Sequence, residues 1–298
     1  MGPRRGWAAA SLLAACVLAT AGCGGPGSAA QAEPAASPDV DTALHDRLPT
    51  RVRDAGVLVV GTDPSYAPMS SYAADGRTIV GMEPDLAADL GDLLGVEVEI
   101  EDTPFDEIID QVEDGRIDLG MTAMTDTPER ARRVDFVDYF VAGTAILVQR
   151  GNPDEIGSLG DLCGTVVAVE QATIQIDLIA RQQDRCRGRQ IQVEEYATNS
   201  DALLRLRTGR VSAVLNDLPP AALLAEDRRT RSFYELATRE QYEPGFYGIA
   251  VRRSDERLRA VLTDALERLV ADGHYDRTLR TWGLEAGAVD EVLVNAGR

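Results

Sequence analysis

The 298-residue chain contains no lysine, so all 30 of its basic residues are arginine. A mechanism that needs a lysine base or a lysine Schiff base is therefore excluded. The chain has only two histidines, His45 and His274, and its four cysteines show no CxxC spacing. Histidines this far apart in the sequence argue against a histidine-based metal site and against a Ser/His/Asp triad.

Basic charge is also scarce, because 30 arginines face 49 acidic residues and the formal net charge is −19. Such a charge repels nucleic acid and anionic lipid, so neither is expected to be a partner. Aromatic residues make up only 5% of the chain, but its 44% share of hydrophobic residues is ordinary. A chain of this length and composition can form one large or two medium domains with cores of their own.

The N-terminal segment is predicted to be an export signal. Arg4 and Arg5 precede an apolar run at residues 7–21, which is too short to span a bilayer. The run ends in Thr-Ala-Gly-Cys, which resembles a bacterial lipoprotein signal with Cys23 as the lipidated first residue of the mature protein. Leu-Ala-Ala-Cys, which ends at Cys16, fits the four-residue pattern better but would truncate the apolar run, so we favour Cys23. The arginine pair leaves twin-arginine export open.

We therefore expect a signal peptide at residues 1–22 and a flexible tether at residues 23–50. The tether is rich in Gly, Pro, Ala and Ser, which bury too little apolar surface to fold. Once the signal is removed, Cys163 and Cys186 remain as a pair outside the membrane. An oxidising compartment and an even count predict a disulfide between them, worth about 3 kcal/mol by chain entropy, with two free buried thiols as the alternative.

From residue 57 onward, short apolar runs alternate with amphipathic segments, which predicts alternating strands and helices. The predicted strands are residues 57–61, 96–101, 116–121, 165–169, 191–195, 211–215 and 247–251. The predicted helices are residues 84–94, 105–113, 173–183, 199–208, 218–224, 255–272 and 275–282. This alternation indicates an α/β protein in which helices cover mainly parallel sheets, with ligands beyond the carboxyl ends of the strands.

Residues 116–140 contain the clearest candidate site, a strand predicted to run into a helix N-terminus. The unpaired N–H groups of a helix start, with the hydroxyls of Thr122 and Thr125, can receive an anion. Arg130, about one turn into that helix, can add a bidentate guanidinium. A single Gly and no Lys favour a small carboxylate over a phosphate. The alternative for Arg130 is a solvated charge among neighbouring arginines.

Asp217 follows the predicted strand at residues 211–215 and occupies the equivalent place in the second run of strands. If the two runs form units that face one another, Asp217 opposes Arg130. A guanidinium and a carboxylate on opposite walls fit the carboxylate and the ammonium of a zwitterionic α-amino acid.

Several stretches together resemble a known family, the polar amino-acid binding proteins of ABC importers, also called family 3 of the bacterial solute-binding proteins. The stretches, in order, are GTDPSYAP, DGRTIVGMEPDLAADLGDLLGVEVE, RIDLGMTAMTDTPERARRVDFVDYF, DLCGTVVAVEQAT, TGRVSAVLND and YGIAV. The resemblance covers nearly all of residues 57–282, and it is specific in combination although each stretch alone is weak.

The resemblance implies a two-lobe periplasmic-binding-protein-like fold of type II, each lobe a mainly parallel sheet flanked by helices. Lobe 1 would comprise residues 51–142 and 247–298, and lobe 2 residues 146–242. Two hinge crossovers, at residues 143–145 and 243–246, would let the lobes close over a ligand. The implied protein is an extracytoplasmic, lipid-anchored monomer that delivers its ligand to an ABC permease in the membrane. No enzymatic activity, cofactor or metal is expected.

The resemblance also implies which residues hold the backbone of the ligand. Arg130 matches the arginine that binds the α-carboxylate. Thr125 and the N–H groups near Ala123 and Thr173 match its helpers. Asp217 matches the acid that binds the α-ammonium.

Five further residues are implied around the ligand side chain. Tyr66 and Phe105 match an aromatic pair that sandwiches it, and Thr122 lines the pocket. Asp63 and Glu170 lie where selectivity is set, and their charge argues against an acidic ligand. The aromatic pair suits an amide or a cation, which favours glutamine, arginine or a lysine-like ligand. Glutamate stays open as an alternative in which arginines line the pocket. The structural alternative for Tyr66 and Phe105 is that both are ordinary core aromatics. The alternative for Asp63 is that it caps its own turn.

Two other classes of protein remain as alternatives. An enzyme on the same fold, such as a dehydratase or a lytic enzyme, would need a general acid, for which Glu170 is the candidate. A sensory or adaptor lipoprotein would bind an amino acid on behalf of a partner and would look the same in sequence.

Overall fold

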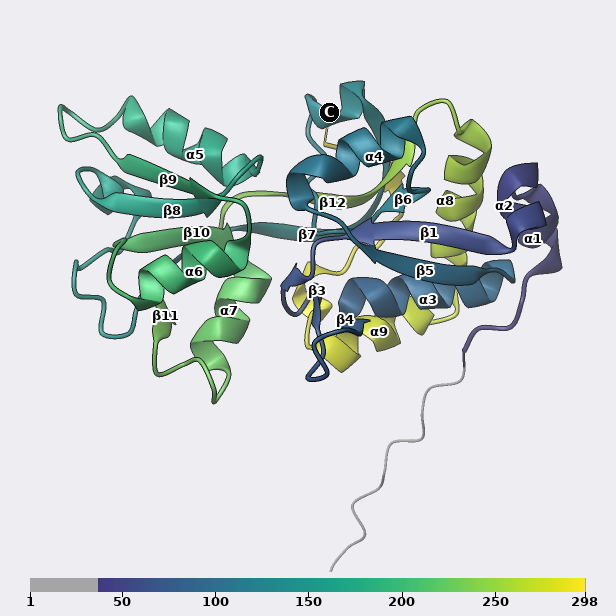
Figure 1. Ribbon diagram of the computed structural model, residues 1–298, viewed down its shortest axis with the longest axis horizontal. Helices are drawn as coiled ribbons and strands as arrows, with labels where there is room; N and C mark the ends of the chain where they lie inside the picture. Colours follow the sequence, from purple (N-terminus) through teal and green to yellow (C-terminus); the bar gives the residue numbers. More distant parts are fainter. Residues whose placement is uncertain (1–36, 298) are drawn as a thin grey trace, which may run out of the picture. The chain divides into compact units, whose positions relative to one another are not determined.

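The computed structural model describes residues 37–297, all within one compact unit (Figure 1). The predicted signal peptide at residues 1–22, the predicted lipidation site Cys23 and the first part of the predicted tether lie outside the described residues. Within residues 37–297, no helix is both long and apolar enough to cross a membrane.

One ten-stranded sheet runs through the described chain in the order β5-β1-β6-β12-β7-β10-β8-β9, with β11 and β13 paired to β7. The strands are parallel within β5-β1-β6 and within β10-β8-β9, and these two groups form the sheets of lobe 1 and lobe 2. The bounds are β1 (Val57–Thr62), β5 (Glu97–Asp102), β6 (Leu119–Gly120), β7 (Val134–Gln149), β8 (Val166–Glu170), β9 (Gln192–Tyr196), β10 (Ala213–Asp217), β11 (Tyr234–Leu236), β12 (Tyr242–Arg252) and β13 (Leu293–Val294). This arrangement confirms the predicted two-lobe α/β fold.

Two long antiparallel strands, β7 and β12, carry the chain between the lobes (Figure 1). The carboxyl-terminal part of β7 pairs with β10 of lobe 2, while its first part pairs with β12 beside β6 of lobe 1. The register of β7 and β12 shifts between Tyr242 and Gly245, which overlaps the segment predicted as a hinge, and again between Tyr247 and Gly248. The exact lobe boundaries stay a prediction.

The helices cover the faces of both sheets (Figure 1). Helix α8 is typical, because its buried residues recur every three or four positions and form one apolar stripe. The bounds are α1 (Thr42–Arg47), α2 (Thr50–Ala55), α3 (Met82–Leu94), α4 (Ile108–Asp114), α5 (Ile174–Gln183), α6 (Asn199–Arg207), α7 (Leu218–Glu226), α8 (Glu256–Ala271) and α9 (His274–Trp282). Short 3-10 helices are η1 (Phe105–Glu107), η2 (Arg130–Arg132), η3 (Leu159–Leu162) and η4 (Glu285–Gly287).

The structure differs from the predicted tether over its last residues. Asp41 caps α1 by accepting hydrogen bonds from two backbone N–H groups, and Leu44 and Leu48 are buried. A capping residue followed by apolar side chains four apart is a helix signal that the Gly- and Pro-rich composition concealed. The folded unit therefore begins before residue 50.

The predicted helix after Thr125 is also wrong. Only the 3-10 turn η2 forms there, and Arg130 is its first residue. Strand β7 begins at Val134, which leaves no room for an α-helix after Pro128. A second small sheet was not predicted; its strands are β2 (Ser65–Tyr66), β3 (Ser70–Tyr72) and β4 (Ile79–Val80).

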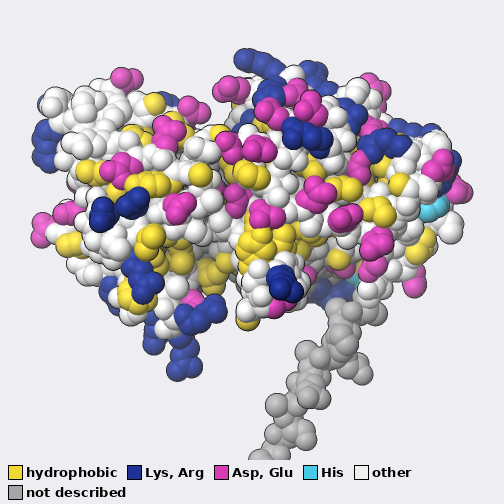
Figure 2. Space-filling model, in the orientation of Figure 1, with side chains coloured by type: hydrophobic (Ala, Val, Ile, Leu, Met, Phe, Trp, Pro, Cys, Tyr) yellow, Lys and Arg dark blue, Asp and Glu magenta, His cyan; other side chains and the backbone are white. Residues whose placement is uncertain are grey.

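The predicted disulfide between Cys163 and Cys186 is confirmed. It lies wholly within lobe 2 and joins the segment before β8 to the segment after α5. On the face in Figure 2, acidic side chains are spread over both lobes, as expected for a chain with a net charge of −19, and arginines gather at the lower end of lobe 2 and along the upper part of lobe 1.

Candidate functional site

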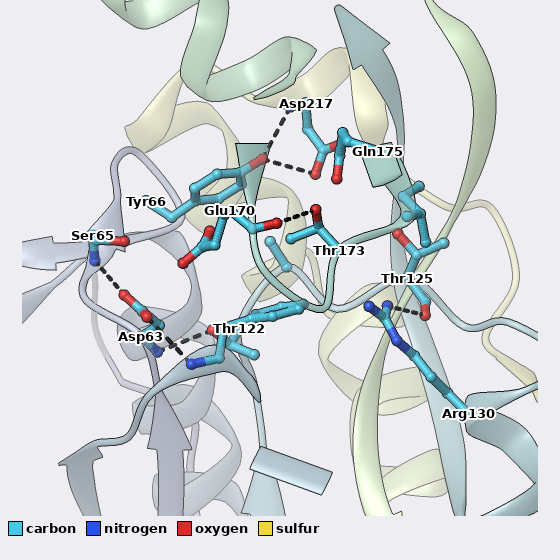
Figure 3. Close-up of a pocket in the computed structure, with 13 residues that line it drawn as sticks. Asp63, Ser65, Tyr66, Thr122, Thr125, Arg130, Glu170, Thr173, Gln175 and Asp217 are labelled. Atoms are coloured by element: carbon cyan, nitrogen blue, oxygen red, sulfur yellow. Dashed lines mark hydrogen bonds between the residues drawn. The ribbon is translucent and has the colours of Figure 1, made fainter. Parts of the chain in front are cut away.

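All ten sequence-predicted ligand residues line one cavity between the lobes (Figure 3). Lobe 1 contributes residues that follow β1, β5 and β6, and lobe 2 contributes the last residues of β8 and β10 and the start of α5. Three further residues line it, Ser65, Ile174 and Gln175. The free space is about 20 Å³, room for about one water molecule, so the lobes are closed against each other. The role of each of these residues in binding a ligand stays a proposal.

Arg130 reaches across the cleft. Its Nη1 donates to the carbonyl oxygen of Thr125 at 2.9 Å and its Nη2 to that of Ala172, in lobe 2, at 2.8 Å. Its guanidinium lies 5.3 Å from the ring centre of Phe105. Loss of hydration lowers the pKa of Arg130 to about 10, and the nearby carboxylate of Asp217 opposes that shift. Arg130 is therefore charged at neutral pH and faces the cavity, and no carboxylate within residues 37–297 forms a salt bridge with it.

Asp217 lies at the carboxyl end of β10 and is 4% exposed. Its carboxylate accepts hydrogen bonds from Tyr247 Oη at 2.6 Å, Gln175 Nε2 at 2.7 Å and Tyr66 Oη at 3.1 Å. Burial raises the pKa of Asp217 to about 6, although these donors and the charge of Arg130 oppose the rise. Because Tyr66 belongs to lobe 1, its bond to Asp217 also links the lobes.

The opposite end of the cavity is acidic. Asp63 accepts hydrogen bonds from the backbone N–H groups of Ser65 at 2.9 Å and Phe105 at 3.3 Å. Glu170 is 8% exposed, and its Oε1 has no hydrogen-bond partner among the described residues; the same holds for the buried Oγ of Ser65. Burial, and secondly the charge of Asp63, raise the pKa of Glu170 to about 8. This end of the site is therefore short of hydrogen-bond donors.

Thr122 and Thr173 support the backbone of the site. Thr122 Oγ1 accepts a hydrogen bond from the N–H of Asp63 at 3.0 Å, and Thr173 Oγ1 donates to the carbonyl oxygen of Glu170 at 2.7 Å. Ala123 differs from the prediction, because its N–H donates to Glu83 at 2.5 Å instead of serving the cavity. Glu83 is buried behind the cavity wall, so Ala123 contributes shape and not a donor.

The sequence reasoning missed Gln175 and Tyr247, both donors to Asp217. Gln175 lies in the first turn of α5, two residues after Thr173, which was itself predicted to bind the ligand. Its position in that turn could therefore have indicated that Gln175 also faces the site. Tyr247 lies on β12, where nothing local indicates that its hydroxyl meets Asp217. Among residues 37–297, no group of three or more His, Cys, Asp or Glu is arranged to hold a metal ion.

Two facing lobes joined by two strands, with a polar cavity between them, define a binding protein of the periplasmic type. The chain belongs to the bacterial extracellular solute-binding proteins, family 3, whose family model matches residues 58–285.

Relatives of known function bind different amino acids. The arginine-binding protein ArgT of Corynebacterium glutamicum is 29% identical over 264 residues, covering 87% of this chain and 84% of the relative. The L-cystine-binding protein TcyJ of Escherichia coli K12 is 29% identical over 245 residues, covering 82% of this chain and 88% of the relative.

Two solved structures share the fold at a somewhat higher identity. An ancestral arginine-binding protein bound to glutamine is 33% identical with a TM-score of 0.71, covering 77% of this chain and 99% of that one. The ancestral amino acid-binding protein AncCDT-1, a precursor of cyclohexadienyl dehydratase, is 31% identical with a TM-score of 0.70, covering 78% of this chain and 97% of that one.

Proposed function

We propose that this protein captures a polar α-amino acid between its lobes and delivers it to an ABC importer. Within the favoured set of glutamine, arginine and lysine-like ligands, arginine fits best. The observation that carries this choice is the acidic end of the cavity, where Glu170 Oε1 and Ser65 Oγ are buried without partners. The amino-acid-binding relatives support the broader function.

The ligand backbone would be held at the other end. Arg130 carries the positive charge that a carboxylate requires, and its two bonds to carbonyl oxygens can be exchanged for stronger bidentate bonds to that carboxylate. Asp217 accepts three hydrogen bonds and still has lone pairs for the α-ammonium. The opposite charges on the two walls therefore suit the two charges of an α-amino acid.

The ligand side chain would be selected by donor number and charge. A guanidinium is planar, carries five N–H donors and is weakly hydrated, so it can bond to Glu170 and Ser65 together and lie against Tyr66 and Phe105. An amide offers two N–H donors and no charge. A carboxylate offers no donor and would be repelled by Asp63 and by the ionised form of Glu170.

Closure over the ligand would be supported by contacts between the two lobes, which can form only when the lobes are closed. Tyr66 bonds to Asp217, Arg130 bonds to the Ala172 carbonyl, and Gln171 Nε2 donates to Asp106 at 2.7 Å across the cleft. A ligand that contacts both walls stabilises the closed state over the open one. Because the cavity has room for about one water molecule in this structure, the ligand must enter through the open state, and the lobes must close less far around it than they do here.

A thermal-shift panel of the twenty amino acids on the full-length protein tests the proposal. A ligand at 100 times its dissociation constant adds about 2.7 kcal/mol to the free energy of unfolding, which is a large shift in unfolding temperature. We expect the largest shift with arginine, smaller shifts with lysine and glutamine, and none with glutamate. A response to glutamate equal to that of arginine, or no response at all, would contradict the proposal.

A dehydratase-type enzyme is the second candidate, because burial raises the pKa of Glu170 to about 8 and a protonated carboxyl in a cleft can act as a general acid. One similar structure is a precursor of a dehydratase. Incubating a labelled ligand or a labelled cyclic amino-acid precursor with the protein and analysing it by NMR distinguishes the two. We expect both to be recovered unchanged.

The extracytoplasmic, lipid-anchored and monomeric states also belong to this proposal. The supporting observation for an anchor is the Thr-Ala-Gly-Cys sequence that ends at Cys23. Mass spectrometry of the protein from bacterial membranes should find diacylglyceryl at Cys23, and Cys23→Ala should release the protein. Light scattering should give the mass of one chain.

A further inference from the structure

Residues 292–297 lie beyond the match to the family model, which ends at residue 285, and they bring the chain back to the site. Strand β13 pairs with β7 at Val137 and Asp138. Next, Asn295 adopts a left-handed backbone conformation, with φ of 55°. Its Oδ1 accepts a hydrogen bond from the N–H of Phe136 at 2.9 Å, and its own N–H donates to the Phe136 carbonyl at 3.1 Å. This 292–297 segment is therefore attached to the strand that joins the lobes.

The segment then donates to two buried carboxylates. The N–H of Ala296 donates to Asp138 at 3.0 Å, and the N–H of Gly297 donates to Asp126 at 2.8 Å. Asp138 is 0% and Asp126 3% exposed. A Cβ atom on Gly297 would lie 2.0 Å from the carbonyl oxygen of Asp126, so no larger residue fits without moving the backbone.

Asp126 directly follows Thr125, whose carbonyl oxygen holds the guanidinium of Arg130. The carbonyl oxygen of Thr125 accepts the hydrogen bond from Arg130 Nη1 at 2.9 Å. The N–H of Asp126 donates to the carbonyl of Phe246 on β12 at 2.8 Å. The peptide unit between Thr125 and Asp126 is thus held by Arg130 and β12, while Gly297 holds the carboxylate beside it.

We propose that the 292–297 segment is a positioning element of the ligand site, which fixes the loop of Thr125 and Asp126 and so orients Arg130. This inference rests on the proposed function and deepens it. A loop that is not fixed must be ordered when the ligand binds, and that ordering weakens the affinity. The segment touches no ligand itself, so its effect passes through Asp126 and Thr125.

Two variants test the proposal. Gly297→Ala pushes the segment away from Asp126, and a chain stopped after Val294 removes both donors but keeps β13. We expect the dissociation constant of the best amino-acid ligand to rise at least 5-fold with Gly297→Ala and further with the shortened chain. The matched control is Leu269→Ala on α8, a buried site away from the cavity, which should lower the unfolding temperature and leave the dissociation constant unchanged.

Hydrogen–deuterium exchange without ligand gives an independent readout. The amides of residues 123–130 should exchange at least 10-fold faster in both variants, while those of α8 should not change. A dissociation constant within twofold of the wild type in both variants would overturn the proposal, and so would unchanged exchange at residues 123–130. If the shortened chain does not fold, Gly297→Ala decides. If the wild type binds no amino acid, the proposed function fails, and exchange alone decides the role of the segment.

Discussion

Glu170 provides the sharpest prediction, because its charge should depend on pH in the range where ligand binding is measured. Burial raises the pKa of Glu170 to about 8, so the carboxyl is mostly protonated at pH 7 in the ligand-free protein. A guanidinium ligand favours the ionised carboxylate and must displace that proton. The affinity for arginine should therefore increase with pH, by about 25-fold between pH 6.5 and 8.5 for a group that ionises fully on binding.

Isothermal titration calorimetry across this pH range measures both the affinity and the proton release. Repeating the titration in buffers of different ionisation enthalpy should show close to one proton released per arginine at pH 7. Glu170→Gln is the matched variant, because it keeps the shape but cannot ionise. It should bind arginine with an affinity nearly independent of pH and release almost no proton. Glutamine, as a neutral ligand, should show the same weak dependence on the wild type.

Two results would refute this reasoning. If Glu170→Gln keeps the full pH dependence, another group is responsible, and Asp217, with a pKa of about 6, is the next candidate. If the affinity for arginine decreases as pH rises, the carboxylate of Glu170 does not meet the ligand cation at all.

Three more predictions follow from the buried charges. Burial raises the pKa values of Glu170, Asp217 and Asp138 to about 8, 6 and 7, above the unfolded values near 4. The folded protein therefore binds more protons than the unfolded chain, so the contribution of these groups to stability is full below about pH 4 and is lost as pH rises toward 8. Ligand-free thermal unfolding should accordingly shift to lower temperature as pH rises from 5 to 8; an upward shift would contradict the assigned burial. Arg130→Ala should abolish the ligand-induced thermal shift, since losing one partner of a buried charge pair costs about 2–5 kcal/mol; an unchanged shift would remove Arg130 from the site. Tyr247→Phe removes one of the hydrogen bonds that the carboxylate of Asp217 accepts. We expect it to lower the free energy of unfolding, measured by urea denaturation, by about 1–3 kcal/mol and to weaken ligand binding. If neither the stability nor the binding changes, water replaces the tyrosine hydroxyl.

The fold and the position of the site could be predicted from sequence because both depend on local patterns. Alternating strands and helices specify parallel sheets, and ligands lie beyond the carboxyl ends of their strands, which places Arg130 in the candidate site of one lobe and Asp217 in that of the other. The two meet in one cavity because the lobes face one another, as the family resemblance implies. The family resemblance placed the aromatic pair there too. No pairing between distant segments had to be known for these steps.

The parts that could not be predicted depend on such pairings. The N–H of Ala123 is taken by Glu83, forty residues earlier, and the hydroxyl of Tyr247 reaches Asp217 from thirty residues later. The helix predicted after Thr125 fails for a similar reason, because β7 must begin at Val134 to pair with β12. Tertiary pairing in these cases overrides a valid local signal.

The disulfide has a consequence for where the protein can function. It closes a ring from Cys163 to Cys186 that contains β8 and α5, and this ring carries Glu170, Thr173 and Gln175. Because the ring does not cross between the lobes, it leaves their opening unhindered and stiffens one wall of the cleft. A reducing environment should therefore weaken ligand capture before it unfolds either sheet. Titrating the protein with dithiothreitol while following ligand binding and circular dichroism should show that binding is lost before secondary structure. If both are lost together, the disulfide supports the sheet of lobe 2 as much as it supports the wall of the cleft.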